Sequence, residues 1–167
     1  MAKNASLAEL GMSLVGSFEE THDIANENIN DHIYPVIDND KDYFVVRDGV
    51  KFAGTHLIID LWEAENLDDL QITERALTRA AEESGATILH THLHHFTPNG
   101  GISGVVVLAE SHISIHTWPE RGYAALDIFM CGDCDPHQGI QALKDNFLPK
   151  RVGVNEIRRG IVGDGEE

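Results

Sequence analysis

Apolar and polar residues alternate along much of the chain after residue 43, which is the period of strands that bury one face. The alternation predicts strands at 44–47, 50–52, 56–62, 86–96, 103–108, 113–116, 123–130 and 150–157. The segment at 103–108 is rich in β-branched residues and should be a buried strand. Asp48 and Gly49 separate the first two runs, so we expect a tight hairpin turn there, at an edge of the sheet.

Two segments have the period of an amphipathic helix instead. The first covers 68–84, and Gly85 should end it. Its apolar positions are Leu70, Leu77, Ala80 and Ala81. The second helix is predicted to begin at Asp135 and Pro136, because aspartate caps helices and proline fits their first turn. The residues of this second helix that should face inward are Ile140, Leu143 and Phe147.

The order of these elements is strand, helix, several strands, helix and strand. It predicts an α+β fold, a two-layer α/β sandwich in which an antiparallel sheet carries helices on one face. A chain of 167 residues is long enough to bury the core of one such domain. The first forty or so residues are polar, acidic and weakly periodic. Residues 1–50 are therefore predicted to be an N-terminal extension that ends in an added hairpin, with the domain itself at 51–167.

Charge limits the classes of partner. The chain has 28 acidic and 12 basic residues, a formal net charge of −16. A nucleic-acid partner would require a basic patch, so none is expected. A cationic small molecule would be attracted by this field.

The cysteines and the apolar runs indicate the cellular compartment of the protein. Cys131 and Cys134 are the two cysteines, and two residues separate them, which fits a reducing compartment better than a disulfide scaffold. The opening stretch has no apolar run typical of a signal peptide or a membrane span. We therefore expect a cytoplasmic protein without a membrane partner.

The chemistry of the chain centres on Ser111, which follows Glu110 between two predicted strands. In the second strand Ser114 and His116 share one face, because residues two apart in a strand point the same way. A serine hydroxyl held against the preceding carbonyl can attack it and convert the amide to an ester. Backbone strain and a donor to the oxyanion make this ester accessible. β-Elimination and hydrolysis would then leave a pyruvoyl group on the new N-terminus, and such a ketone can form a Schiff base with a substrate amine.

The neighbouring residues extend this motif over about two-thirds of the chain, from about Ala53 to about Arg159. The segments concerned are Gly101–Val107, Glu110–His112, Ile115–Glu120, Gly122–Ala125, Cys131–Asp133 and Asp135–Pro136. Together they resemble the bacterial and archaeal pyruvoyl-dependent S-adenosylmethionine decarboxylases. The resemblance implies a proenzyme that cleaves itself between Glu110 and Ser111, with a covalent pyruvoyl cofactor made from Ser111 and no metal.

The same resemblance assigns roles to matching positions. Ser103 and His116 match processing residues, and a histidine can take and return a proton near neutral pH. Cys131 matches the donor that protonates the substrate carbon, and an ordinary thiol is still protonated at neutral pH. Glu120 matches a carboxylate that binds the ribose hydroxyls, and Phe96 matches a ring that stacks on adenine.

The activity implied by the resemblance is the conversion of S-adenosylmethionine to S-adenosylmethioninamine and CO2, which supplies spermidine synthesis. Members of this family pair as homodimers with active sites at or near the interface, so a homodimer of cleaved protomers is also implied. An alternative substrate is a basic amino acid, ornithine or arginine, because the loop at 96–101 is one residue longer than the usual family version and the segment before Ala53 is unusual.

Two further patterns leave other classes open. His90, His92 and His94 would share one face of a strand, and with Cys131 and Cys134 they could indicate a zinc-binding protein that is not an enzyme. The cysteine pair before a helix also resembles a redox motif, although the nearby Asp133 and Asp135 disfavour a thiolate.

Overall fold

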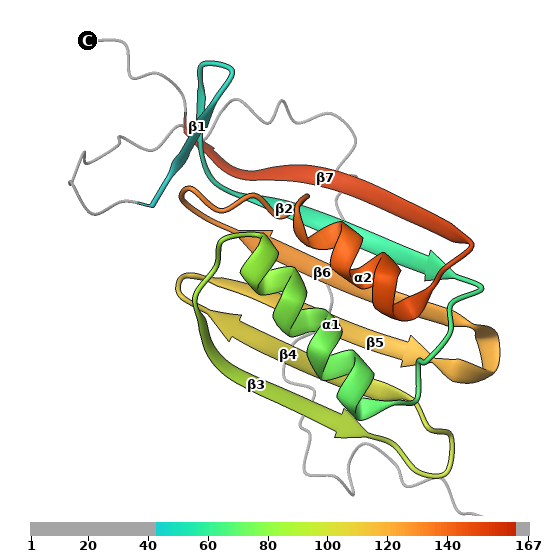
Figure 1. Ribbon diagram of the computed structural model, residues 1–167. Coiled ribbons are helices and arrows are strands. Elements are labelled where there is room, and N and C mark those ends of the chain that lie inside the picture. The colour runs from blue at the N-terminus through green and yellow to red at the C-terminus, as the bar shows by residue number, and fades with distance from the viewer. Residues whose placement is uncertain (1–42, 163–167) are drawn as a thin grey trace, which may run out of the picture. The chain divides into compact units, whose positions relative to one another are not determined.

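The computed structural model describes residues 43–162. Within this range seven strands form one sheet, and two α-helices cover one of its faces (Figure 1). The elements are β1 (Val45–Arg47), β2 (Val50–Trp62), α1 (Leu70–Glu83), β3 (Ile88–His95), β4 (Ile102–Leu108), β5 (Ser111–Trp118), a 3-10 turn (Pro119–Arg121), β6 (Tyr123–Met130), α2 (Gly139–Phe147) and β7 (Arg151–Val162). The sheet order is β7-β2-β6-β5-β4-β3, β1 also pairs with β2, and every pair is antiparallel. The predicted α+β class is confirmed.

The hairpin predicted at 44–52 is present as β1 and the start of β2. Its turn residues Asp48 and Gly49 have φ values of 54° and 76°, the left-handed pair that a two-residue hairpin turn requires. The runs predicted as separate strands at 50–52 and 56–62 form one strand, β2, which pairs with β7 along nearly its whole length. Residues 1–42 of the predicted extension lie outside the described residues, so the domain boundary at residue 50 stays a prediction.

Helix α1 forms where its pattern predicted, with Asp69 accepting hydrogen bonds from two backbone N–H groups at its start. Its buried residues are Thr73, Ala76, Leu77, Ala80 and Ala81. Leu70, one of the apolar positions that predicted the helix, is 38% exposed in the first turn.

Helix α2 begins later than predicted, at Gly139 rather than at Asp135 and Pro136. The Asp135 carboxylate accepts a hydrogen bond from the His137 backbone N–H at 3.1 Å, so the aspartate stabilises a turn before the helix instead of capping the helix itself. Leu143 and Phe147 are fully buried as predicted, and Ile140 is partly buried against the same core.

The core lies between the helices and one face of the sheet. Alternate residues of the central strands, such as Ile113 and Ile115 of β5, are completely buried there. The remaining strand residues form the opposite face, which is not covered by a helix in the part of the chain that the structure describes (Figure 1). We call it the open face. None of the helices within 43–162 is long and apolar enough to cross a membrane.

Candidate functional site

Ser111 begins β5 directly after a tight turn. Leu108 pairs with Ser111 across this turn, so only Ala109 and Glu110 connect β4 to β5. Glu110 has a φ of 58°, a left-handed conformation that is unfavourable for a residue with a side chain. The Glu110–Ser111 junction therefore lies at a strained point of the backbone.

The Ser111 hydroxyl is held by the end of the neighbouring strand. The Cys131 backbone N–H donates to Ser111 Oγ at 3.2 Å, and Ser111 is 8% exposed. This contact follows from the register, because His112 lies opposite Phe129 and the start of β5 therefore reaches the end of β6. Glu110, Ser111 and Cys131 thus meet at one end of the sheet, which we call the reactive end.

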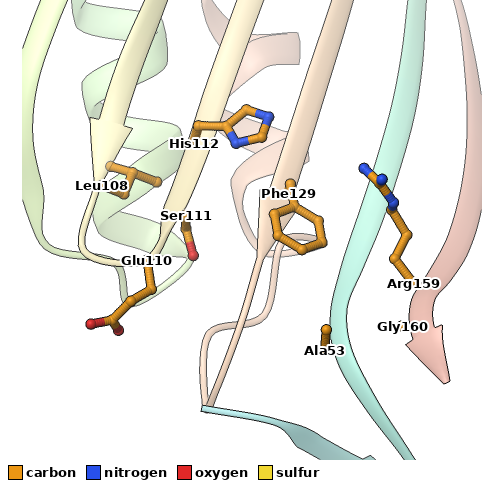
Figure 2. A pocket seen from close by; sticks show the side chains of 8 residues that line it. All are labelled: Ala53, Leu108, Glu110, Ser111, His112, Phe129, Arg159 and Gly160. Carbon is orange, nitrogen blue, oxygen red and sulfur yellow. The ribbon is translucent and has the colours of Figure 1, made fainter. Parts of the chain in front are cut away.

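A cavity of about 530 Å³ opens at the reactive end (Figure 2). Its walls come from five strands and the β4–β5 turn, and its lining residues are Ala53, Leu108, Glu110, Ser111, His112, Phe129, Arg159 and Gly160. Burial lowers the pKa of His112, and the charges of His56 and Arg159 lower it further. The imidazole of His112 is therefore uncharged at neutral pH.

Both cysteines are protonated thiols at neutral pH. Burial raises the pKa of the Cys131 thiol, and the Glu110 carboxylate and Cys134 add to the shift. Burial also raises the pKa of Cys134, followed by Asp133 and Glu110. A redox motif requires a lowered thiol pKa, so the structure argues against that interpretation and favours a proton donor.

The predicted processing pair forms a direct contact on the open face. Ser103 of β4 lies opposite His116 of β5, and Ser103 Oγ is 2.8 Å from His116 Nδ1. A second cavity of about 270 Å³ lies beside this pair, and its lining includes Phe96, Trp118 and Glu120. Phe96, Ser103, His116 and Glu120 therefore gather around one hollow, which we call the histidine end.

The two ends are far apart in one protomer. Ser111 and His116 are at opposite ends of β5, five residues apart, which corresponds to about 17 Å at roughly 3.3 Å per residue. The fold thus brings the predicted site residues together in two groups and leaves the groups separate.

An aromatic row supports the histidine end, and sequence reasoning did not identify it. The His116 ring is 6.3 Å from Trp118, Trp118 is 5.3 Å from Tyr123, and Tyr123 is 5.9 Å from Trp62. The Arg151 guanidinium stacks over Trp62 at 3.9 Å. The Tyr123 hydroxyl donates to Asp60 at 2.5 Å, which fixes the middle of the row. Register explains most of the row, because Trp118, Tyr123, Trp62 and Arg151 lie opposite one another on neighbouring strands. His116 precedes Trp118 by two residues on the same face of β5.

Histidines also lie on the open face along the edge strand β3. His90 and His92 lie opposite Val107 and Val105 of β4, so the predicted sharing of a face is correct. However, no group of three or more His, Cys, Asp or Glu side chains within residues 43–162 has an arrangement that could hold a metal ion. His56 instead contacts Asp127, with 3.3 Å between Nε2 and Oδ1, and Asp127 also accepts a hydrogen bond from Ser114.

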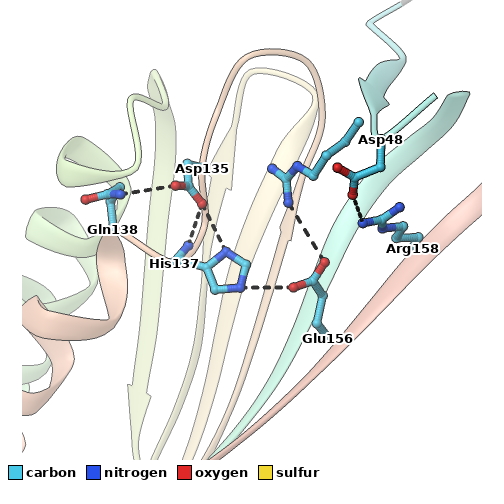
Figure 3. Close-up of polar contacts among 7 residues, drawn as sticks. Asp48, Asp135, His137, Gln138, Glu156 and Arg158 are labelled. Atoms are coloured by element: carbon cyan, nitrogen blue, oxygen red, sulfur yellow. Dashed lines mark hydrogen bonds and ion pairs between the residues drawn. The ribbon is translucent and has the colours of Figure 1, made fainter. Parts of the chain in front are cut away.

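A polar cluster holds the segment between Cys131 and α2 against the far edge of the sheet (Figure 3). The His137 ring lies between two carboxylates, 3.0 Å from Asp135 and 3.1 Å from Glu156 of β7. Arg47 approaches Glu156 at 3.9 Å, and Arg158 pairs with Asp48 at 2.8 Å. The segment that follows Cys131 is thereby tied to both β7 and the β1–β2 hairpin.

Comparisons with known proteins agree with this geometry. A family model described as S-adenosylmethionine decarboxylase matches residues 55–160. The S-adenosylmethionine decarboxylase proenzyme of Thermotoga maritima is 48% identical over 114 residues, which are 66% of this chain and 87% of the relative. The corresponding proenzyme of Thermomicrobium roseum is 41% identical over 116 residues, 69% of this chain and 100% of the relative. The crystal structure of the adenosylmethionine decarboxylase from Aquifex aeolicus superimposes with a TM-score of 0.62 at 32% identity, covering 70% of this chain and 98% of that one.

Proposed function

Because the chain belongs to the S-adenosylmethionine decarboxylase family, we propose that it is a proenzyme that cleaves itself between Glu110 and Ser111 and then decarboxylates S-adenosylmethionine. The observation that carries the proposal is the left-handed Glu110 joined to a serine whose hydroxyl is already hydrogen bonded. The product, S-adenosylmethioninamine, would serve as the aminopropyl donor for spermidine synthesis. The family favours this nucleoside substrate over ornithine or arginine.

The residues at the reactive end fit a pyruvoyl group made from Ser111. The serine is at the start of a strand, and the preceding residue occupies the strained conformation that favours loss of the amide. When formed, the pyruvoyl ketone supplies an electrophile for the substrate amine and an electron sink for the electrons left by CO2. The neighbouring 530 Å³ cavity offers room for the amino-acid part of the substrate.

Cleavage requires proton transfers that the Ser103–His116 pair is suited to perform. Ser111 Oγ would attack the Glu110 carbonyl carbon and form an ester as the amide C–N bond breaks. A base must then remove the α-proton of Ser111 so that the ester can eliminate. His116 Nδ1 is engaged by Ser103 at 2.8 Å, which leaves Nε2 as the atom that can exchange a proton.

Cys131 is placed to return a proton after decarboxylation. Burial and the Glu110 charge raise the pKa of its thiol, so the thiol stays protonated at neutral pH. Its backbone N–H contacts Ser111, which keeps the side chain close to the reacting carbon of a substrate held there. We assign no role to Cys134.

Phe96 and Glu120 would bind the nucleoside part of the substrate. Both line the hollow at the histidine end, where the Phe96 ring packs edge-to-face against His94 and is still 47% exposed for stacking on a base. The Glu120 carboxylate can accept hydrogen bonds from two adjacent hydroxyls. The amino-acid part would bind at the reactive end and the nucleoside at the histidine end.

This division requires two protomers, because about 17 Å separates the two ends within one chain. We infer a homodimer in which the open faces of two sheets stack about a two-fold axis. Such an axis would place the reactive end of one protomer against the histidine end of its partner, and would form two composite sites.

Exposed apolar side chains on the open face support this arrangement. Val107, Trp118 and Ile157 are 39%, 41% and 48% exposed, and they belong to the strand positions that face away from the helices. Stacking a second sheet on this face would remove them from water.

The proposal is tested by the intact mass of the purified protein under denaturing conditions. We expect two fragments that meet between Glu110 and Ser111, with a blocked terminus on the second. Incubation with carboxyl-labelled S-adenosylmethionine should release labelled CO2, whereas labelled ornithine and arginine should release none. A single uncut mass would overturn the self-cleavage mechanism, and release from an amino acid alone would reassign the substrate.

A further inference from the structure

Arg159 projects from β7 into the cavity that contains Ser111 (Figure 2). The proposed function gives Arg159 no role. Its guanidinium lies over the Phe129 ring, with 5.7 Å between the guanidinium carbon and the ring centroid. Within residues 43–162 it forms no ion pair with a carboxylate. A guanidinium stacked on a ring keeps its hydrogen-bond donors available at its edge.

The substrate brings a carboxylate into this cavity. The amine that reacts with the Ser111-derived ketone and the carboxylate that leaves are attached to the same carbon, so both must be near Ser111. Glu110 lines the same cavity, and cleavage would give it a second negative charge at its new C-terminus. A carboxylate entering beside Glu110 therefore needs a cation.

Arg159 is the cation that lines the cavity. The other basic side chain in its lining is His112, whose pKa is lowered by burial and by the charges of His56 and Arg159. An uncharged imidazole cannot neutralise the carboxylate at neutral pH.

We propose that Arg159 binds the α-carboxylate of the substrate and thereby distinguishes S-adenosylmethionine from its own product, which lacks that group. This inference rests on the function proposed above and names a specificity residue within that site. The contact exists before CO2 leaves and is lost when it leaves. Arg159 therefore contributes to substrate binding more than to the chemical step.

The test compares ligands with and without the carboxylate. In the Arg159→Met variant we expect normal self-cleavage, a KM for S-adenosylmethionine raised by about 10- to 100-fold, and a kcat that is unchanged or higher. The Kd of S-adenosylmethioninamine, measured by calorimetry on the cleaved enzyme, should stay the same. Arg159→Lys should recover part of the lost affinity for the substrate, since it keeps the charge without the planar fork.

Arg158→Met is the matched control, because it removes the same charge from the adjacent residue, which pairs with Asp48 instead of lining the cavity. It should leave both affinities unchanged. Equal weakening of substrate and product in Arg159→Met would overturn the assignment, as would an unchanged KM. Failure of the unsubstituted protein to cleave or to release CO2 would instead contradict the proposed function, so the two failures are distinguishable.

Discussion

The two ends of strand β5 are built differently. At the reactive end Ser111 follows a strained Glu110, and its hydroxyl has one backbone donor, Cys131, within hydrogen-bond distance. At the histidine end His116 is bonded to Ser103 and is the first ring of a row that Tyr123 anchors to Asp60. In the proposed mechanism one end therefore supplies the bond that breaks, whereas the other supplies an ordered group for proton transfer. Because neither end contains what the other has, one protomer would hold two incomplete sites under the proposed mechanism.

The largest expected effect comes from substituting one residue at each end and combining the two variants in one dimer. Ser111→Ala should remain uncut, and His116→Ala should cleave about 100-fold more slowly or worse, since general acid–base catalysis is lost. Coexpression of the two variants should restore cleavage of the His116→Ala chains, because each mixed dimer would contain one complete composite site. Intact mass measures this directly.

The control for this mixing experiment replaces the Ser111→Ala partner with a chain that carries both substitutions. No composite site is then complete, and cleavage should stay slow. Rescue by the double variant, or no rescue by Ser111→Ala, would show that the two ends do not cooperate across an interface.

Cys131→Ala should separate cleavage from turnover at the reactive end. The backbone N–H that contacts Ser111 is retained, so cleavage should continue, while turnover should fall by about 100-fold because the proton donor is missing. Mass spectrometry and labelled CO2 release measure the two steps separately. Cys134→Ala is the matched control and should preserve both, and normal turnover in Cys131→Ala would remove the residue from its proposed role.

Tyr123→Phe should lower the stability of the protein through the histidine end, and its effect should be smaller than those of the substitutions above. The substitution deletes the hydroxyl that donates to Asp60, and we expect a loss of about 1 kcal/mol in the free energy of unfolding. Urea unfolding at fixed protein concentration measures the change. Asp60→Asn and the double variant complete a cycle, and strictly additive losses would show that the two side chains are not coupled.

The smallest expected effect concerns the acid dependence of stability, through Asp135 in the polar cluster of Figure 3. Burial alone would raise the pKa of Asp135, but hydrogen bonds from Gln138 and His137 outweigh it and lower the pKa. A lowered folded pKa stabilises the protein above the unfolded value of about 3.9, and this contribution is lost as the pH falls through the folded pKa. Asp135→Asn should therefore lose less stability than the unsubstituted protein between about pH 6 and about pH 3 in urea unfolding. An equal loss in both would exclude Asp135 from the acid response.

Much of the fold followed from short-range patterns. The alternation of 123–130 gave the bounds of β6, and Asp48-Gly49 gave the hairpin turn, because the period of two and the left-handed turn are local properties of the backbone. The start of α2 could not be predicted from such patterns. Asp135 and Pro136 satisfy helix-start preferences, but the polar contacts of Asp135 with His137 and Gln138 stabilise a separate turn, and these depend on the local folded geometry.

The candidate site shows the same division. The sequence by itself determined the reactive junction, since Glu110 and Ser111 are neighbours in the chain, and it placed Ser114 and His116 on one face of a strand. It also pointed to the family, whose segments are local motifs. The contacts across the sheet, which join Tyr123 to Trp62 and bring Arg159 to the Ser111 cavity, depend on the register of strands far apart in the chain.

Tertiary structure alone decided the distance between Ser111 and His116 and the two groups into which the site residues fall. Spacing in the sequence is short between them, yet an extended strand separates its residues by roughly 3.3 Å each, so five residues in β5 keep the two side chains apart. In the same sheet, pairing brings Cys131 to Ser111 and Ser103 to His116 across much longer intervals of sequence. Neighbours in the chain fix the bond that we propose to break, and strand register fixes which groups can act on it.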